Sequence, residues 1–191
     1  YLLSDEVYEH LVFDGREHAS VLRHEELYQR AFVISSFGKT YHVTGWKTGY
    51  VVAPASLSSE LRKVHQYVSF TGVTPLQWAL ADFMAAHPEH ISELPAFYQA
   101  KRDLFCDLLA GSRFRFTRAA GTYFQLADYS AIRPDLDDVA MAEWLTREHG
   151  VASIPISVFY QDAPANLRLV RFCFAKREET LRQAAEKLCA I

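Results

Sequence analysis

Short, continuously apolar runs are the feature that most constrains the fold of this chain. They occur at residues 1–4, at Ala31–Ser35 and at Thr48–Ala53. None of them alternates apolar and polar residues, as a strand with one solvent-facing side would. Strands buried on both faces are typical of sheets that helices cover from either side. The first part of the chain is therefore predicted to belong to an α/β layer.

Helical patterns follow the third run. After Pro54, apolar residues recur on one helix face at Leu57, Leu61, Val64 and Val68. Thr74 and Pro75 predict the next helix start, with threonine as the N-cap and proline in the first turn. That helix is expected to end before Pro88.

The pattern changes after residue 88. A long helix is expected from about Ile91 to Gly111, a residue suited to a left-handed C-terminal cap. Strands are expected at 114–117, 122–126 and 167–174, and helices at about 137–150 and around Leu181–Leu188. The sequence thus predicts an α/β part over residues 1–88 and a smaller α+β domain over residues 89–191.

Composition excludes several classes of partner. The chain has 191 residues and a formal net charge of −3, which gives no reason to expect nucleic acid or an anionic membrane as partner. No apolar run is long enough to span a bilayer. Cys106, Cys173 and Cys189 are odd in number and widely spaced, which predicts reduced, buried thiols in a cytoplasmic protein. Without paired ligands of suitable spacing, no metal site is expected.

The segment 35–50 is the most informative part of the sequence. Small residues and glycines surround Lys39 directly after a predicted buried strand, where ligand crevices form in open α/β sheets. A partly desolvated lysine there would have a lowered pKa and a nucleophilic amine. Taken alone, a lysine in such a loop is more often a solvated surface residue.

Several further motifs occur in a consistent order along the chain. Ser36-x-x-Lys39 and Lys47 follow Asp5-x-x-Tyr8, and the later runs are GTYF at 121–124, IPISVF at 154–159 and RFCFAK at 171–176. Together they resemble the fold-type I, class I/II aminotransferases, in particular the branch of methionine and kynurenine aminotransferases. The resemblance covers essentially the whole chain. It implies that residues 1–88 are the C-terminal part of the large cofactor-binding domain and that residues 89–191 are the small C-terminal domain.

The resemblance also implies a cofactor, pyridoxal 5′-phosphate, and roles for five residues near it. Lys39 would bind the cofactor covalently and act as the base, Asp5 would pair with the pyridine nitrogen, and Tyr8 would hydrogen-bond to the ring's 3-oxygen. Ser36 and Lys47 would bind the phosphate. Many related enzymes carry arginine at the Lys47 position, and lysine keeps the charge but loses the two-pronged geometry.

Arg171 is the predicted substrate-binding residue. It lies inside the apolar run 167–174, which would not otherwise tolerate a cation. In the family the matching arginine holds the substrate's α-carboxylate. The alternatives are an ion pair with an inward carboxylate or an exposed strand face. Arg168 is out of phase with Arg171 and is expected to be solvated.

The implied function is the transfer of an amino group from an amino acid, large neutral or sulfur-containing, to a 2-oxo acid. Two alternatives stay open: a carbon–sulfur β-lyase of the same fold, and the aminotransferase-like effector domain of a MocR-type regulator. The resemblance also implies a homodimer. The chain is expected to be the C-terminal half of such an enzyme, and inactive when isolated.

Overall fold

The computed structural model describes residues 1–191 as two compact units, Tyr1–Pro95 and Ala96–Ile191. The division falls inside helix α5 (His90–Leu109), at a proline within that helix. Proline removes one backbone hydrogen bond from a helix interior, so it is a natural weak point. The predicted boundary after Pro88 lies just ahead of this helix.

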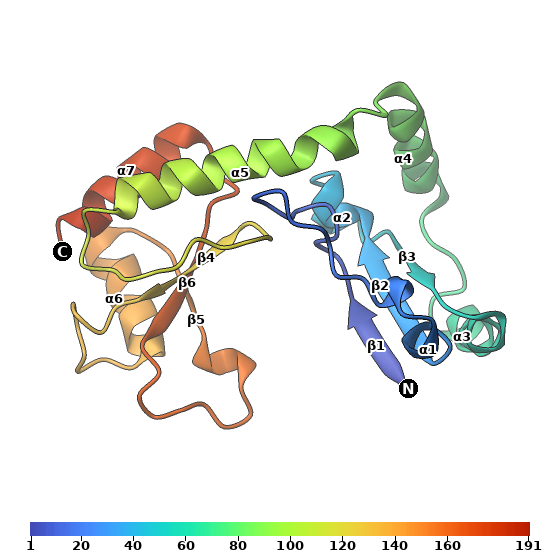
Figure 1. The fold of residues 1–191 in the computed structure, drawn as a ribbon, viewed down its shortest axis with the longest axis horizontal. Helices are drawn as coiled ribbons and strands as arrows, with labels where there is room; N and C mark the ends of the chain where they lie inside the picture. Colours follow the sequence, from blue (N-terminus) through green and yellow to red (C-terminus); the bar gives the residue numbers. More distant parts are fainter. The chain divides into compact units, whose positions relative to one another are not determined.

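The first unit is built on a three-stranded sheet with the order β1-β2-β3 (Figure 1). Strand β1 (Leu2–Asp5) pairs in parallel with the central strand β2 (Ala31–Ser36), and β3 (Gly49–Val52) pairs antiparallel to β2. All three strands lie at the predicted apolar runs. Alternate residues of β2, from Ala31 to Ser35, are buried.

Short and long helices connect and follow these strands. The short ones are η1 (Val21–Arg23), α1 (Glu25–Tyr28), α2 (Phe37–Thr40) and η2 (Thr44–Trp46), and the long ones are α3 (Ala55–Val68) and α4 (Thr74–Ala86).

Two details of the long helices differ from the prediction. The apolar stripe of α3 is not buried, since Val64 is 60% and Val68 is 76% exposed. No residue of α3 is buried, because nothing in the first unit covers that stripe. Helix α4 begins at Thr74 itself, preceded by Val73, and has no side-chain N-cap. The predicted threonine cap is therefore wrong by one residue.

The second unit contains an antiparallel sheet with the order β4-β6-β5. Its strands are β4 (Phe124–Asp128), β5 (Ile154–Pro155) and the central β6 (Leu169–Cys173). Residues 114–117 do not form a strand of their own and contribute one bridge, between Arg115 and Asp128. The helical elements are α6 (Asp138–His149), η3 (Ser157–Phe159) and α7 (Glu178–Cys189).

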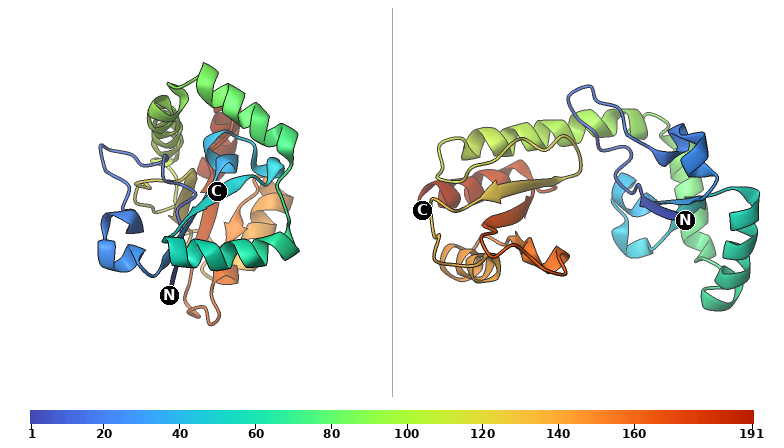
Figure 2. Two further views of the ribbon diagram at one scale, coloured as in Figure 1. Left: turned by 90° about the vertical axis from the view of Figure 1, so that its right-hand side faces the viewer. Right: turned by 60° about the horizontal axis from the view of Figure 1, so that its bottom comes forward.

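The core of the second unit lies on one face of β6. Val170 and Phe172 are buried there, and the Phe172 ring contacts the rings of Phe105 in α5 and Phe114. Helix α7 lies beside the C-terminal part of α5 (Figures 1 and 2), where the Cys189 thiol donates to the Leu108 carbonyl. The other face of β6 carries Arg171.

The predicted helix ends and the predicted burial of the cysteines agree with the structure only in part. Asp137 caps α6 by accepting a hydrogen bond from the Ala140 amide at 2.8 Å, and Gly150 ends it at φ 63°. Gly111 is not left-handed, so that predicted cap is wrong. The cysteines are free, but only Cys106 is fully buried and Cys189 is exposed.

None of the helices has the length and apolarity that crossing a membrane requires.

Candidate active site

The parallel pair β1–β2 brings three of the predicted site residues to one edge of the sheet. Asp5 ends β1 opposite Ile34, and the Glu6 amide donates the last bond of the pair to the Ile34 carbonyl at 2.8 Å. Strand β2 then runs directly into α2, which contains Lys39. Parallel strands present their carboxyl ends at the same edge, where α/β proteins bind ligands. Asp5, Ser36 and Lys39 therefore share this edge.

Ser36 organises the transition from strand to helix. Its hydroxyl oxygen accepts a hydrogen bond from the Gly38 amide at 3.1 Å, as the N-cap of α2, and donates to the Thr48 carbonyl at 3.3 Å. The Phe37 amide also donates to the Thr48 carbonyl, at 3.1 Å. Lys47 precedes Thr48 and is exposed in the left-handed region at φ 54°. The structure thus places Lys47 on the segment that is hydrogen-bonded to the start of α2.

Two glycines allow this close approach. A Cβ atom at Gly38 would lie 2.8 Å from the Thr44 Cα, and one at Gly49 would lie 2.5 Å from the Ser35 carbonyl oxygen. Real Cβ atoms do not approach backbone atoms so closely. The Thr44 hydroxyl also donates to the Gly38 carbonyl at 3.1 Å. The loop after Lys39 is therefore folded tightly against α2, and Lys39 is half-buried.

Asp5 is the last residue of β1, and Tyr8 lies in the turn that follows it. The Asp5 carboxylate is exposed and accepts a hydrogen bond from the Val7 amide at 3.2 Å. Tyr8 is half-buried in the turn that follows the strand. Its carbonyl accepts from the Leu11 amide at 2.9 Å, which closes this turn.

Arg171 belongs to the second unit and forms no ion pair with an acidic side chain. Its guanidinium carbon lies 4.0 Å from the ring centre of Phe124 and 4.9 Å from that of Phe159. Its cross-strand neighbours are Leu126 and Ile154, both apolar. The Arg171 Nε is buried and donates no hydrogen bond. A guanidinium held by aromatic rings, with an unused buried donor, suits an incoming carboxylate.

Arg168 differs from its prediction. It is half-buried, and its guanidinium donates to the backbone carbonyls of Pro134 at 3.0 Å and Leu167 at 2.9 Å. It therefore stabilises a loop instead of extending into solvent.

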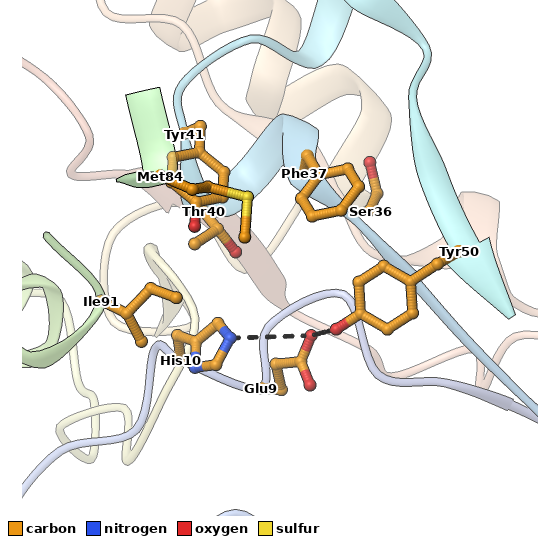
Figure 3. Close-up of a pocket in the computed structure, with 9 residues that line it drawn as sticks. All are labelled: Glu9, His10, Ser36, Phe37, Thr40, Tyr41, Tyr50, Met84 and Ile91. Carbon is orange, nitrogen blue, oxygen red and sulfur yellow. Dashed lines mark hydrogen bonds and ion pairs between the residues drawn. The ribbon is translucent and has the colours of Figure 1, made fainter. Parts of the chain in front are cut away.

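A pocket of about 330 Å³ lies beside Ser36 in the first unit. Its wall combines rings and aliphatic side chains with the carboxylate of Glu9 and the hydroxyl of Tyr50 (Figure 3). Glu9 and Tyr50 were not predicted from the sequence. The two residues are distant in the chain. The only signal in the sequence is that Glu9 directly follows the predicted site residue Tyr8.

Comparison with known proteins gives consistent matches. The family model described as "Aminotransferase class I and II" matches residues 1–188. The chain is 56% identical to the methionine aminotransferase of Escherichia coli (strain K12), over 98% of this chain and 48% of that relative. It is 37% identical to kynurenine–oxoglutarate transaminase 3 of Rattus norvegicus, over 96% of this chain and 44% of that relative.

Solved structures agree. A crystal structure from Escherichia coli, reported to identify a methionine aminotransferase function, has a TM-score of 0.93 at 56% identity, covering 99% of this chain and 50% of that one. N-succinyldiaminopimelate aminotransferase from Mycobacterium tuberculosis has a TM-score of 0.89 at 35% identity, covering 98% of this chain and 49% of that one. The chain spans about half the length of these relatives.

Proposed function

Because the chain belongs to the class I and II aminotransferases, we propose that it carries the pyridoxal phosphate lysine, Lys39, of a transaminase. The observation that carries this proposal is the shared sheet edge, where the carboxyl ends of β1 and β2 present Asp5, Ser36 and Lys39. A carboxylate, a hydroxyl and an amine at one edge are groups that suit the ring nitrogen, the phosphate and the aldehyde of this cofactor. Because the family model matches residues 1–188, we interpret this arrangement as a cofactor site.

The residues of this edge fit the cofactor chemically. Ser36 places a hydroxyl group at the start of α2, and the exposed Lys47 adds a positive charge on the adjoining segment, which together would suit a phosphate group. Asp5, exposed at its strand end, would keep a proton on the pyridine nitrogen. Tyr8 would donate a hydrogen bond to the ring's 3-oxygen. When bound, pyridoxal phosphate supplies an electron-accepting ring that stabilises negative charge at the substrate's Cα.

The protein's own part in the reaction is to bind, orient and move a proton. Lys39 Nζ would take the proton from the substrate's Cα and later return it, because an amine on a short, tightly held helix can stay close to that atom. Arg171 would bind the α-carboxylate through two parallel hydrogen bonds. Its unpaired Nε and its two aromatic contacts support this role.

We propose a large neutral or sulfur-containing amino acid as the amino donor and a 2-oxo acid as the acceptor. The similarity to a methionine aminotransferase and to a kynurenine–oxoglutarate transaminase supports this class. The apolar neighbours of Arg171, Leu126 and Ile154, agree with an apolar substrate side chain.

A homodimer is the proposed assembly. Exposed apolar side chains gather on α3, the start of α4 and the loop between them, namely Val64, Tyr67, Val68, Phe70, Val73 and Trp78. Apolar side chains in such numbers mark surfaces that another chain covers. The three free cysteines support the predicted cytoplasmic location.

Borohydride trapping tests the proposal. The purified protein is mixed with an equimolar amount of pyridoxal phosphate and reduced, and the labelled peptide is identified by mass spectrometry. We expect the label on Lys39, lost in Lys39→Ala and kept in Lys63→Ala, a control lysine exposed on α3. Label scattered over surface lysines, and unchanged by Lys39→Ala, would contradict the assignment.

A further inference from the structure

Glu9 joins three segments of the first unit through one carboxylate oxygen. Its Oε1 accepts a hydrogen bond from the Ser35 hydroxyl at 2.5 Å. The same oxygen accepts a hydrogen bond from the Tyr50 hydroxyl, which Figure 3 shows. Ser35 and Tyr50 face each other across β2 and β3. The Nε2 of His10 lies 3.8 Å from the same oxygen. The turn after β1 is thereby tied to both other strands of the sheet.

This connection is protected from solvent on the Ser35 side and more open at Tyr50, which is 37% exposed. The Glu9 side chain is 22% exposed, and Ser35 is 4% exposed. Hydrogen bonds to a carboxylate are stronger than neutral ones, and more so away from water. Burial, together with the bond to Glu9, raises the pKa of Tyr50 to about 12. Tyr50 therefore keeps the proton that it donates throughout the physiological pH range.

Two residues of this connection are sequence neighbours of predicted site residues. Glu9 directly follows Tyr8, and Ser35 directly precedes Ser36. The last backbone bond of the parallel pair joins Glu6 to Ile34. Beyond that bond, the Glu9 side chain continues the link between the Tyr8 turn and the strand that leads into α2.

We propose that Glu9 is a positioning residue that fixes the turn carrying Tyr8 relative to the strand end carrying Ser36 and Lys39. This inference rests on the proposed function. We assign Glu9 no part at the reacting atoms, and its Oε1 serves as the acceptor of two hydroxyl groups of the sheet. Its effect passes through Tyr8, whose hydrogen bond to the cofactor's 3-oxygen requires a fixed turn.

The test compares Glu9→Ala with Glu9→Gln in the intact enzyme loaded with pyridoxal phosphate. Glutamine keeps an acceptor oxygen for Ser35 and Tyr50, whereas alanine removes it. For Glu9→Ala we expect the Kd for pyridoxal phosphate to rise about tenfold, the effect of losing a hydrogen bond to a charged group. The pH midpoint of the bound cofactor's absorbance should also rise. Glu9→Gln should restore most of both values, and the surface control Glu60→Ala should match the wild type.

Thermal unfolding separates positioning from stability alone. A lowered Tm in Glu9→Ala with unchanged Kd and pH midpoint would overturn the inference. If Glu9→Ala does not fold, Ser35→Ala and Tyr50→Phe each remove one donor and should each shift the midpoint in the same direction. If the wild type itself fails to hold the cofactor at Lys39, the proposed function fails. A normal wild type with unaffected variants overturns only the role of Glu9.

Discussion

At the scale of single residues, Arg171 is a position where substitution is expected to affect activity and stability differently. Its guanidinium contacts two aromatic rings, and its buried Nε has no hydrogen-bond acceptor. An unpaired buried donor costs folding free energy, on the order of 1–3 kcal/mol. That cost would be offset only when a carboxylate binds. Residues retained for binding at such a cost are a known source of stability–activity trade-offs.

Arg171→Met should therefore abolish substrate binding without unfolding the protein. In the intact enzyme, we expect KM for the amino donor to rise at least about a hundredfold, because a charge-assisted, two-pronged contact is lost. The Tm should stay equal or rise, since methionine suits the apolar neighbours. Arg171→Lys should fall in between, and Arg182→Met, on the exposed side of α7, serves as the control. Unchanged KM in Arg171→Met would assign the carboxylate to another residue.

At the scale of elements, α2 depends on its surroundings. A helix of four residues is too short to be stable through its own hydrogen bonds. It is fixed by the Ser36 cap, by the bond from Thr44 to the Gly38 carbonyl, and by the close contact at Gly38. The position of Lys39 is thus set by residues that follow it in the chain.

Gly38→Ala should disturb this element. The added Cβ would lie 2.8 Å from the Thr44 Cα, and a backbone atom cannot yield as a flexible side chain would. We expect a loss of about 1–3 kcal/mol in the free energy of unfolding, as for other overpacked sites. Denaturant unfolding measures it. Gly45→Ala is the matched control, because a Cβ there meets nothing within 4 Å. Equal stability of the two variants would show that α2 tolerates a shift.

Local signals in the sequence predicted local structure only in part, because the caps expected at Thr74 and Gly111 are not formed. Asp137 and Gly150 mark the ends of α6 because each acts within one turn of its own position. Signals that depend on distant partners were less reliable. The apolar stripe of α3 indicated a helix but not that it would be exposed, and the two-residue β5 is defined only by its pairing with β6.

At the scale of the whole molecule, the sequence predicted only those site residues that belong to recognisable motifs. The spacing of Ser36, Lys39 and Lys47 predicts a cofactor loop, because those residues lie on one short segment. Glu9 and Tyr50 escaped prediction, because their bond joins positions that only the folded sheet brings together. Arg168 was misjudged for the same reason, since its acceptor at Pro134 is remote in sequence.

The stability of the molecule should fall in two steps as the solution becomes acidic. Burial lowers the pKa of His10 and of His42 below the ordinary value of 6.5, although Glu9 partly opposes this at His10, and nearby His90 adds to the lowering at His42. The unfolded chain then binds protons at a higher pH than the folded one. Stability is therefore complete above about pH 6.5 and declines below it, down to the folded pKa values.

Glu6 contributes to the second step. Burial raises its pKa, but hydrogen bonds from the Val21 amide and from His18 outweigh burial, so its pKa lies below the ordinary 4.5. Its contribution is present above about pH 4.5 and is lost as the pH falls through the folded pKa.

His42→Asn should reduce the first step and leave the second unchanged. Asparagine tolerates the left-handed backbone at residue 42, where φ is 58°, and it carries no titrating group. The measurement is denaturant unfolding at a series of pH values, with His65→Asn on the exposed surface of α3 as control. A decline between about pH 6.5 and 5 that is identical in wild type and His42→Asn would assign the first step to His10 or to other groups.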